Sequence, residues 1–112
     1  MKTYTICLIG LRTQQTVVVG GGHVAARKVE GLLAADAQVM IISPVLIPEL
    51  KKLVDSGAIS FIQRTYQEGD LEGVFLAIAA TDDPSVNHAV WAEATRRGCL
   101  INVVDDPEHS TF

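Results

Sequence analysis

Short aliphatic runs alternate along this chain with segments in which apolar residues recur at helical spacing, a pattern typical of parallel strands joined by helices. We predict strands at residues 16–19, 38–42, 58–62, 74–80 and 100–104, and helices at 23–35, 48–55 and 84–97. The run 74–80 is apolar at every position, which indicates a central strand buried on both faces. An acidic loop at 67–73 joins the third strand to the fourth. Residues 1–15 are expected either to pair at a sheet edge or to pack across the strand ends.

This order of elements predicts an α/β fold built on one doubly wound parallel sheet. Right-handed crossovers place about five strands in the spatial order 3-2-1-4-5, with helices on both faces. The chain has 112 residues and contains no repeat, linker or low-complexity segment, so we expect a single domain over residues 1–112.

Composition and charge exclude several classes of function. The net charge of -4, with no basic cluster longer than the pair Arg96 and Arg97, argues against nucleic acid as a partner. No apolar stretch approaches the ~18 residues of a membrane span, and none has the features of a signal peptide, so no membrane contact is expected. Cys7 and Cys99 lie among apolar residues and read as reduced thiols of a cytoplasmic protein.

The sequence Gly20-Gly21-Gly22-His23-Val24-Ala25 lies directly between the first predicted strand and the first predicted helix. Its spacing, G-x-G-x-x-A, is that of a dinucleotide-binding Rossmann turn, in which free amides at the helix start bind the pyrophosphate. The alternative is a turn that binds nothing, but three consecutive glycines cost much backbone entropy for a purely structural purpose. His23 is interpreted as contributing its backbone amide, with catalysis as the less favoured alternative.

The position after the second strand lacks the residue that NAD-binding folds usually carry there. An acidic side chain commonly ends this strand and holds the ribose hydroxyls. Here Ser43 takes that place, followed by Pro44 and Val45, and no arginine is present to receive a 2′-phosphate. The residues alone therefore favour NAD over NADP only weakly.

Polar residues also follow the fourth strand. Asp83 before Pro84 is typical of a helix cap followed by a first-turn proline. Thr81 and Asp82 are not needed for that cap, so we interpret them as contacts to the ribose or to the reacting groups of a bound ligand.

Two adjacent carboxylates, Asp105 and Asp106, follow the fifth strand. Neighbouring carboxylates can shift one another's pKa, which suits acid–base or cation chemistry, although a solvated turn is the equally simple alternative. Asp106 precedes Pro107, which favours an extended backbone, and we expect its side chain to face solvent. No spacing of His, Cys and Asp residues resembles a closed zinc site, so no metal is predicted.

Four stretches fall together in the order and spacing of one known family. They are residues 11–12 with 17–28, 37–39 with 43–44, 77–83 with Asn87, and 102–107. In these stretches the chain resembles the precorrin-2 dehydrogenase domain of siroheme synthase over nearly its whole length from Leu11. The first stretch is generic to dinucleotide binding, whereas the last two together are specific.

The resemblance implies oxidation of precorrin-2 to sirohydrochlorin in siroheme biosynthesis, with NAD as the hydride acceptor. It places the catalytic aspartate on Asp105, and the nucleotide contacts on the glycine turn with His23 and Val24 and on Pro44 and Val45. In some members of the family the same site inserts ferrous iron. Members continue beyond the position of Phe112 with a segment that completes the tetrapyrrole pocket and the homodimer, so we expect these 112 residues alone to turn over precorrin-2 slowly or not at all.

Two alternatives belong to other functional classes. A non-catalytic nucleotide sensor, of the kind that regulates potassium transporters, shares the fold and the glycine turn. Such sensors usually end the second strand with an acidic residue, so Ser43 argues against this alternative. A Rossmann half that only dimerises is disfavoured by the glycine turn.

Overall fold

The computed structural model describes residues 14–112, apart from the side chain of Pro107. The elements are β1 (Gln15–Val19), α1 (His23–Ala34), β2 (Gln38–Ile42), α2 (Pro48–Asp55), β3 (Ser60–Ile62), β4 (Leu76–Ala79), α3 (Pro84–Arg97), β5 (Leu100–Val103) and the short 3-10 helix η2 (Pro107–His109). The expectations for Cys7 and for residues 1–13 of the segment 1–15 lie outside the described residues.

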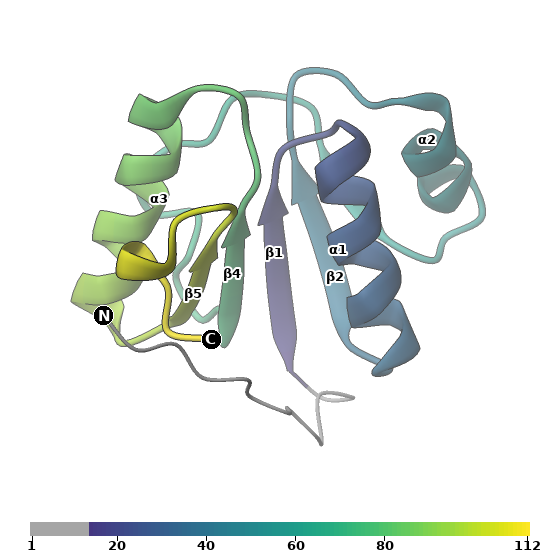
Figure 1. Cartoon of the computed structure of the whole chain (residues 1–112). Coiled ribbons are helices and arrows are strands. Elements are labelled where there is room, and N and C mark those ends of the chain that lie inside the picture. The colour runs from purple at the N-terminus through teal and green to yellow at the C-terminus, as the bar shows by residue number, and fades with distance from the viewer. Residues whose placement is uncertain (1–13) are drawn as a thin grey trace.

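The five strands form one parallel sheet in the order β3-β2-β1-β4-β5, which confirms the predicted topology. Helix α1 and helix α2 lie on one face of the sheet and α3 lies on the other (Figure 1). The order of strands reverses at β1, which pairs with β2 on one side and with β4 on the other.

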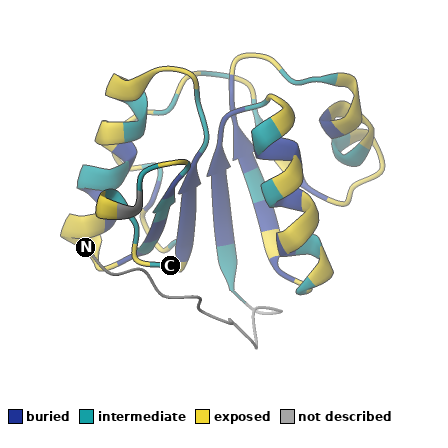
Figure 2. Cartoon of the chain, viewed as in Figure 1, coloured by how far each residue is buried: buried dark blue, intermediate teal, exposed yellow. Residues whose placement is uncertain are grey.

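The core is divided into two layers by the sheet, because successive side chains of a strand point to opposite faces. Val18, Ile41 and Ile78 belong to the layer under α1, which also contains Val29 of that helix. The opposite layer, under α3, includes Val90 and Ala94 of that helix with Val17, Ile42 and Ile101 of the sheet. The central strands β1 and β4 are accordingly almost fully buried, whereas the helices on both faces of the sheet expose their outer surfaces (Figure 2).

Three predicted strands are shorter in the structure than the aliphatic runs that suggested them, and of these β5 is shorter by its last residue, Val104. β4 covers Leu76–Ala79 rather than 74–80, because Val74 closes a turn on Leu71 and Phe75 is 37% exposed. β3 begins at Ser60 rather than at residue 58, because the amide of Ala58 still bonds to the carbonyl of Leu53 at the end of α2.

The predicted helix caps are confirmed at α3. The Asp83 side chain accepts a hydrogen bond from the Ser85 amide at 2.9 Å, and Pro84 occupies the first turn. Gly98 ends the helix with a φ of 72°, a left-handed conformation that glycine adopts without steric cost.

A buried carboxylate ties the loop between β3 and β4 to α3. Glu93 of α3 is fully buried and accepts hydrogen bonds from the Tyr66 hydroxyl, from the Leu71 amide at 3.2 Å and from Arg97 Nε at 2.7 Å. This loop replaces a crossover helix, as predicted. Its turns are closed by backbone hydrogen bonds such as that from the Asp70 amide to the Gln67 carbonyl, and the Glu93 side chain joins it to α3.

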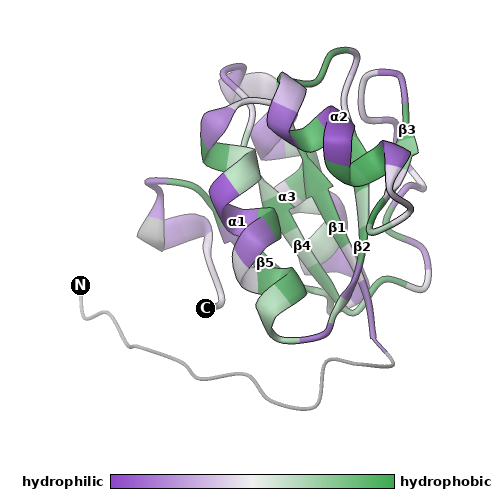
Figure 3. Ribbon diagram, turned by 90° about the vertical axis from the view of Figure 1, so that its right-hand side faces the viewer, coloured by the Kyte–Doolittle hydropathy of each residue, from purple (hydrophilic) through white to green (hydrophobic). Residues whose placement is uncertain are grey.

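The register aligns the carboxyl ends of four strands at one edge of the sheet. Val19 pairs with Ile42 and Ala79, and Ala79 pairs with Val103. The residues that follow these strands are therefore brought together. Apolar residues concentrate in the strands that support this edge (Figure 3).

Among the described residues, no helix is long and apolar enough to cross a membrane. Cys99 is free and buried, and burial raises the pKa of its thiol to about 11.

Candidate functional site

A cleft of about 690 Å³ lies at the carboxyl edge of the sheet, and we name it the glycine cleft. All eleven residues singled out in the sequence line it, from four separate segments: Gly20, Gly21, Gly22, His23, Val24, Ser43, Pro44, Val45, Thr81, Asp82 and Asp105. Four further residues, which sequence reasoning missed, complete the lining: Leu46, Ile47, Ala80 and Val104. All four are apolar and lie within two positions of residues that had been singled out, and this proximity along the chain is the signal that could have found them.

The structural surroundings differ at the three glycine positions of the turn, and so does the need for glycine at each. A Cβ on Gly20 would lie 2.4 Å from the carbonyl oxygen of Ala80, and the φ of Gly20 is 132°, so this position requires glycine. A Cβ on Gly21 would lie 2.0 Å from the carbonyl oxygen of Val45. A Cβ on Gly22 would meet nothing within 4 Å, so no protein contact accounts for glycine there.

The first turn of α1 presents unsatisfied backbone donors to the cleft. Gly22 occupies the N-cap and contributes no side-chain cap, and the first turn contains no acidic residue. The first amides of a helix have no intrahelical partner, and the helix dipole adds partial positive charge at this end. By contrast, the Asp83 side chain caps α3. The uncapped start of α1 is therefore suited to an anion such as a phosphate.

Two hydroxyl side chains singled out in the sequence are engaged within the protein: Ser43, which takes the place of the ribose-binding acid, and Thr81, which was interpreted as a ligand contact. Ser43 is 5% exposed and donates its hydroxyl to the carbonyl of Val45 at 2.7 Å. The Thr81 hydroxyl contacts Asn87 Oδ1 at 2.7 Å and the carbonyl of Asp83 at 3.0 Å. Both residues line the cleft, but these contacts limit what their hydroxyls offer to a ligand.

Asn87 of α3 fixes the turn after β4. Its Oδ1 accepts from the Thr81 amide at 3.1 Å, and its Nδ2 donates to the Thr81 carbonyl at 3.0 Å. This bidentate contact holds Thr81 and the neighbouring Asp82 at the edge of the sheet. Asn87 belonged to the stretches that carry the family resemblance, but sequence reasoning gave it no role.

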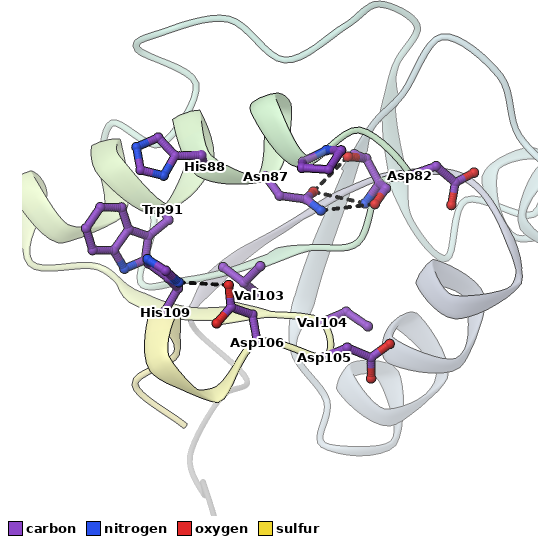
Figure 4. A pocket seen from close by; sticks show the side chains of 11 residues that line it. Asp82, Asn87, His88, Trp91, Val103, Val104, Asp105, Asp106 and His109 are labelled. Carbon is purple, nitrogen blue, oxygen red and sulfur yellow. Dashed lines mark hydrogen bonds and ion pairs between the residues drawn. The ribbon is translucent and has the colours of Figure 1, made fainter. Parts of the chain in front are cut away.

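A second pocket, of about 370 Å³, adjoins the glycine cleft, and we name it the histidine pocket. Its walls include residues of α3 and of the segment after β5, among them His88, Trp91, Asp106 and His109 (Figure 4). Thr81, Asp82, Val104 and Asp105 line both cavities. No pattern along the chain predicted the aromatic residues of this pocket, because only the packing of η2 against α3 brings them together.

The adjacent carboxylates Asp105 and Asp106 point in different directions (Figure 4). Asp105 is exposed at the boundary between the two cavities. Asp106 turns toward His109, whose Nδ1 lies 2.7 Å from its Oδ2. The Asp106 side chain is 41% exposed, so it faces solvent as expected, but a residue three positions later also supplies a partner for its carboxylate.

The chemistry of the glycine cleft fits a dinucleotide. The uncapped amides of α1 and the open space above Gly22 suit a pyrophosphate, and the exposed side chain of Val45 with Leu46 and Ile47 offers an apolar wall for a flat ring. Within the described part of the chain, no group of three or more His, Cys, Asp or Glu side chains is placed to hold a metal ion.

The chain is similar to proteins of known family. A family model with the description "Putative NAD(P)-binding" matches residues 7–112. Siroheme synthase of Chromobacterium violaceum is 48% identical over 102 residues, which cover 91% of this chain and 22% of that protein. Siroheme synthase of Methylobacillus flagellatus is 46% identical over 112 residues, which cover 100% of this chain and 24% of that protein.

A solved structure named "SirC, precorrin-2 dehydrogenase" superposes with a TM-score of 0.82 at 29% identity, over 93% of this chain and 50% of that one. This chain thus spans about a quarter of the length of the curated relatives and half of the solved one. The family match covers the β1–α1 turn and every other segment of the glycine cleft. The chain belongs to this NAD(P)-binding family.

Proposed function

We propose that this chain is the NAD-dependent dehydrogenase part of a siroheme synthase and oxidises precorrin-2 to sirohydrochlorin. One observation carries the proposal: the carboxylate of Asp105 lies where the glycine cleft, which suits the dinucleotide, meets a second pocket that is open to a substrate. The similarity to proteins named siroheme synthase and to a structure named precorrin-2 dehydrogenase supports precorrin-2 as that substrate.

Different residues of the cleft bind different parts of the dinucleotide in this proposal. The amides of Gly22, His23 and Val24 hold the pyrophosphate, and Pro44 and Val45 contact the adenosine end. Asp82 stands at the same boundary as Asp105 and contacts the ribose or the reacting groups. The absence of an arginine after Ser43 to receive a 2′-phosphate favours NAD over NADP.

The oxidation removes one hydride and one proton from the tetrapyrrole, and the electron pair left behind by the proton forms the new double bond. Bound NAD supplies the acceptor for the hydride. Asp105 accepts the proton, because its carboxylate is exposed to both cavities. Asp106 has no such role, because its carboxylate is turned toward His109.

The proposal extends to the assembly and location of the protein. We propose that residues 1–112 form one NAD-binding domain, that the complete protein is a cytoplasmic homodimer, and that its remaining segments complete the tetrapyrrole pocket. The curated relatives, which are about four times as long as this chain, support such further segments.

The test compares Asp105→Asn with Asp106→Asn in the complete gene product at saturating NAD. Asp105→Asn is expected to lower kcat by roughly 10²–10⁴-fold, the range typical of general acid–base groups, with NAD affinity nearly unchanged. Asp106→Asn should retain turnover within a few-fold, because asparagine still offers an oxygen to His109. Parental turnover in Asp105→Asn would show that the assignment is wrong.

A further inference from the structure

Asp105 has a backbone conformation that residues other than glycine seldom adopt, although aspartate does so more often than most. Its φ is 61°, in the left-handed region, where a non-glycine residue is strained. Such a conformation persists only where the surrounding structure enforces it, and it is common at functional sites. The contacts on either side of Asp105 therefore decide where its carboxylate points.

The backbone on both sides of Asp105 is held by hydrogen bonds. The Val104 amide donates to the carbonyl of Ala79 at 3.1 Å, which anchors the residue before it to β4. The Asp106 amide donates to the carbonyl of Val103 at 3.0 Å and closes a tight turn over Asp105. The position of Asp106 thus fixes the geometry of the turn that contains Asp105.

Asp106 is held in turn by the segment that follows it. Its carbonyl accepts from the Ser110 hydroxyl at 2.8 Å and from the His109 amide at 3.2 Å. Its side chain contacts His109 Nδ1 at 2.7 Å, and because a carboxylate only accepts hydrogen bonds, Nδ1 is the donor.

The ring of His109 is itself fixed by α3. It packs edge to face against Trp91, with the ring centroids 4.7 Å apart, and Trp91 lies 5.3 Å from the ring of His88. Figure 4 shows this arrangement, with His109 between Trp91 and the Asp106 carboxylate. A continuous chain of contacts therefore runs from α3 through His109 and Asp106 to the turn at Asp105.

We propose that His109 and Asp106 are positioning residues for Asp105: their side-chain hydrogen bond, braced by Trp91, holds Asp105 in its left-handed turn with the carboxylate at the boundary of the two cavities. The catalytic consequence rests on the proposed function, whereas the structural statement does not. The pair does not exchange protons with the substrate itself.

Two variants of His109 separate the possible roles of this side chain. Asparagine places a donor near the position of Nδ1 but lacks the ring, whereas phenylalanine keeps a ring against Trp91 but has no donor. We expect His109→Asn to retain kcat within a few-fold, and His109→Phe to lower kcat roughly 10- to 100-fold, the scale expected when a reacting group is displaced by about 1 Å. NAD affinity and KM should change little in both.

Other outcomes would overturn the proposal. Loss of kcat in both variants would indicate that the imidazole takes part in proton transfer, and loss in His109→Asn alone would indicate that only ring packing matters. The carboxylate gives a second comparison: Asp106→Ala should behave as His109→Phe does, whereas Asp106→Asn, which keeps an acceptor, should resemble the parent.

A spectroscopic readout tests the positioning without any turnover. The backbone ¹³Cα and amide chemical shifts of Asp105, measured by NMR on the 112-residue chain, should report left-handed geometry in the parent and in His109→Asn. They should move toward ordinary values in His109→Phe and Asp106→Ala. Unchanged shifts in these two variants would refute the positioning role, whereas absence of precorrin-2 turnover in the complete gene product would refute the proposed function alone.

Discussion

Gly21 and Val45 meet backbone to backbone, although 24 positions separate them in the chain. A Cβ atom on Gly21 would lie 2.0 Å from the carbonyl oxygen of Val45, and the Gly21 carbonyl accepts a hydrogen bond from the Ile47 amide at 2.9 Å. The glycine turn after β1 is therefore locked to the loop after β2. Of the two neighbouring glycines, Gly21 serves the fold, and Gly22 leaves open the space in which a ligand would lie.

The first prediction concerns Gly22→Val. A Cβ at Gly22 meets nothing within 4 Å, so the variant should fold normally, but its branched side chain would occupy the space assigned to the pyrophosphate. We expect NAD affinity to fall at least about tenfold, which corresponds to about 1.4 kcal/mol, in a calorimetric titration. Gly31→Val is the matched control, because Gly31 also has open space around it but lies outside the cleft. Equal NAD affinity of Gly22→Val and the parent would contradict the assignment.

Gly21→Ala should show the opposite behaviour and lower stability. The added methyl group would overlap with a backbone carbonyl, which cannot move as the end of a flexible side chain can. Overpacking of this kind costs about 1–3 kcal/mol, measurable as a shift of the urea midpoint. NAD affinity measured well below the unfolding transition would change less than in Gly22→Val. A urea midpoint equal to that of the parent would show that the loop after β2 can move to accommodate the added methyl group.

Glu93 should be among the most sensitive positions outside the cleft. Glu93→Ala removes a fully buried acceptor from Tyr66, Leu71 and Arg97, and breaking a buried network of this kind costs about 3–5 kcal/mol. Glu93→Gln keeps the shape and an acceptor oxygen and should cost less. Chemical denaturation of both variants provides the measurement, and equal stability of Glu93→Ala and the parent would argue that the loop is held by other contacts.

The ion pair between Arg64 and Asp70 predicts a pH-dependent stability. Two hydrogen bonds of 2.8 Å join the side chains, and the Arg64 guanidinium lowers the pKa of Asp70 from its ordinary value of 3.8. A lowered folded-state pKa adds stability above pH 3.8 that is lost as the pH falls through that pKa. Arg64→Gln should therefore melt a few degrees below the parent at pH 7, with the difference vanishing in acid. A constant difference across this range would exclude the carboxylate as its source.

The sequence by itself determined the α/β fold, the strand order and the identity of the residues that follow each strand. These features depend on local signals: the aliphatic runs, the glycine turn, and the Asp83–Pro84 cap that the structure confirms. Because the carboxyl ends of parallel strands meet at one edge of the sheet, strand order alone placed Gly20, Ser43, Thr81 and Asp105 near one another.

Only the tertiary structure decided how the side chains at that edge are used. Ser43 looked like a ribose contact, but its hydroxyl is satisfied by the Val45 carbonyl in a loop whose shape no local pattern encodes. Asp106 was expected to face solvent because it precedes Pro107; its side chain is partly exposed, but His109 also contacts its carboxylate, and Trp91 of α3 packs against His109. Such contacts depend on the packing of segments that are far apart in the chain, or on one specific turn, and hydrophobic periodicity contains information about neither.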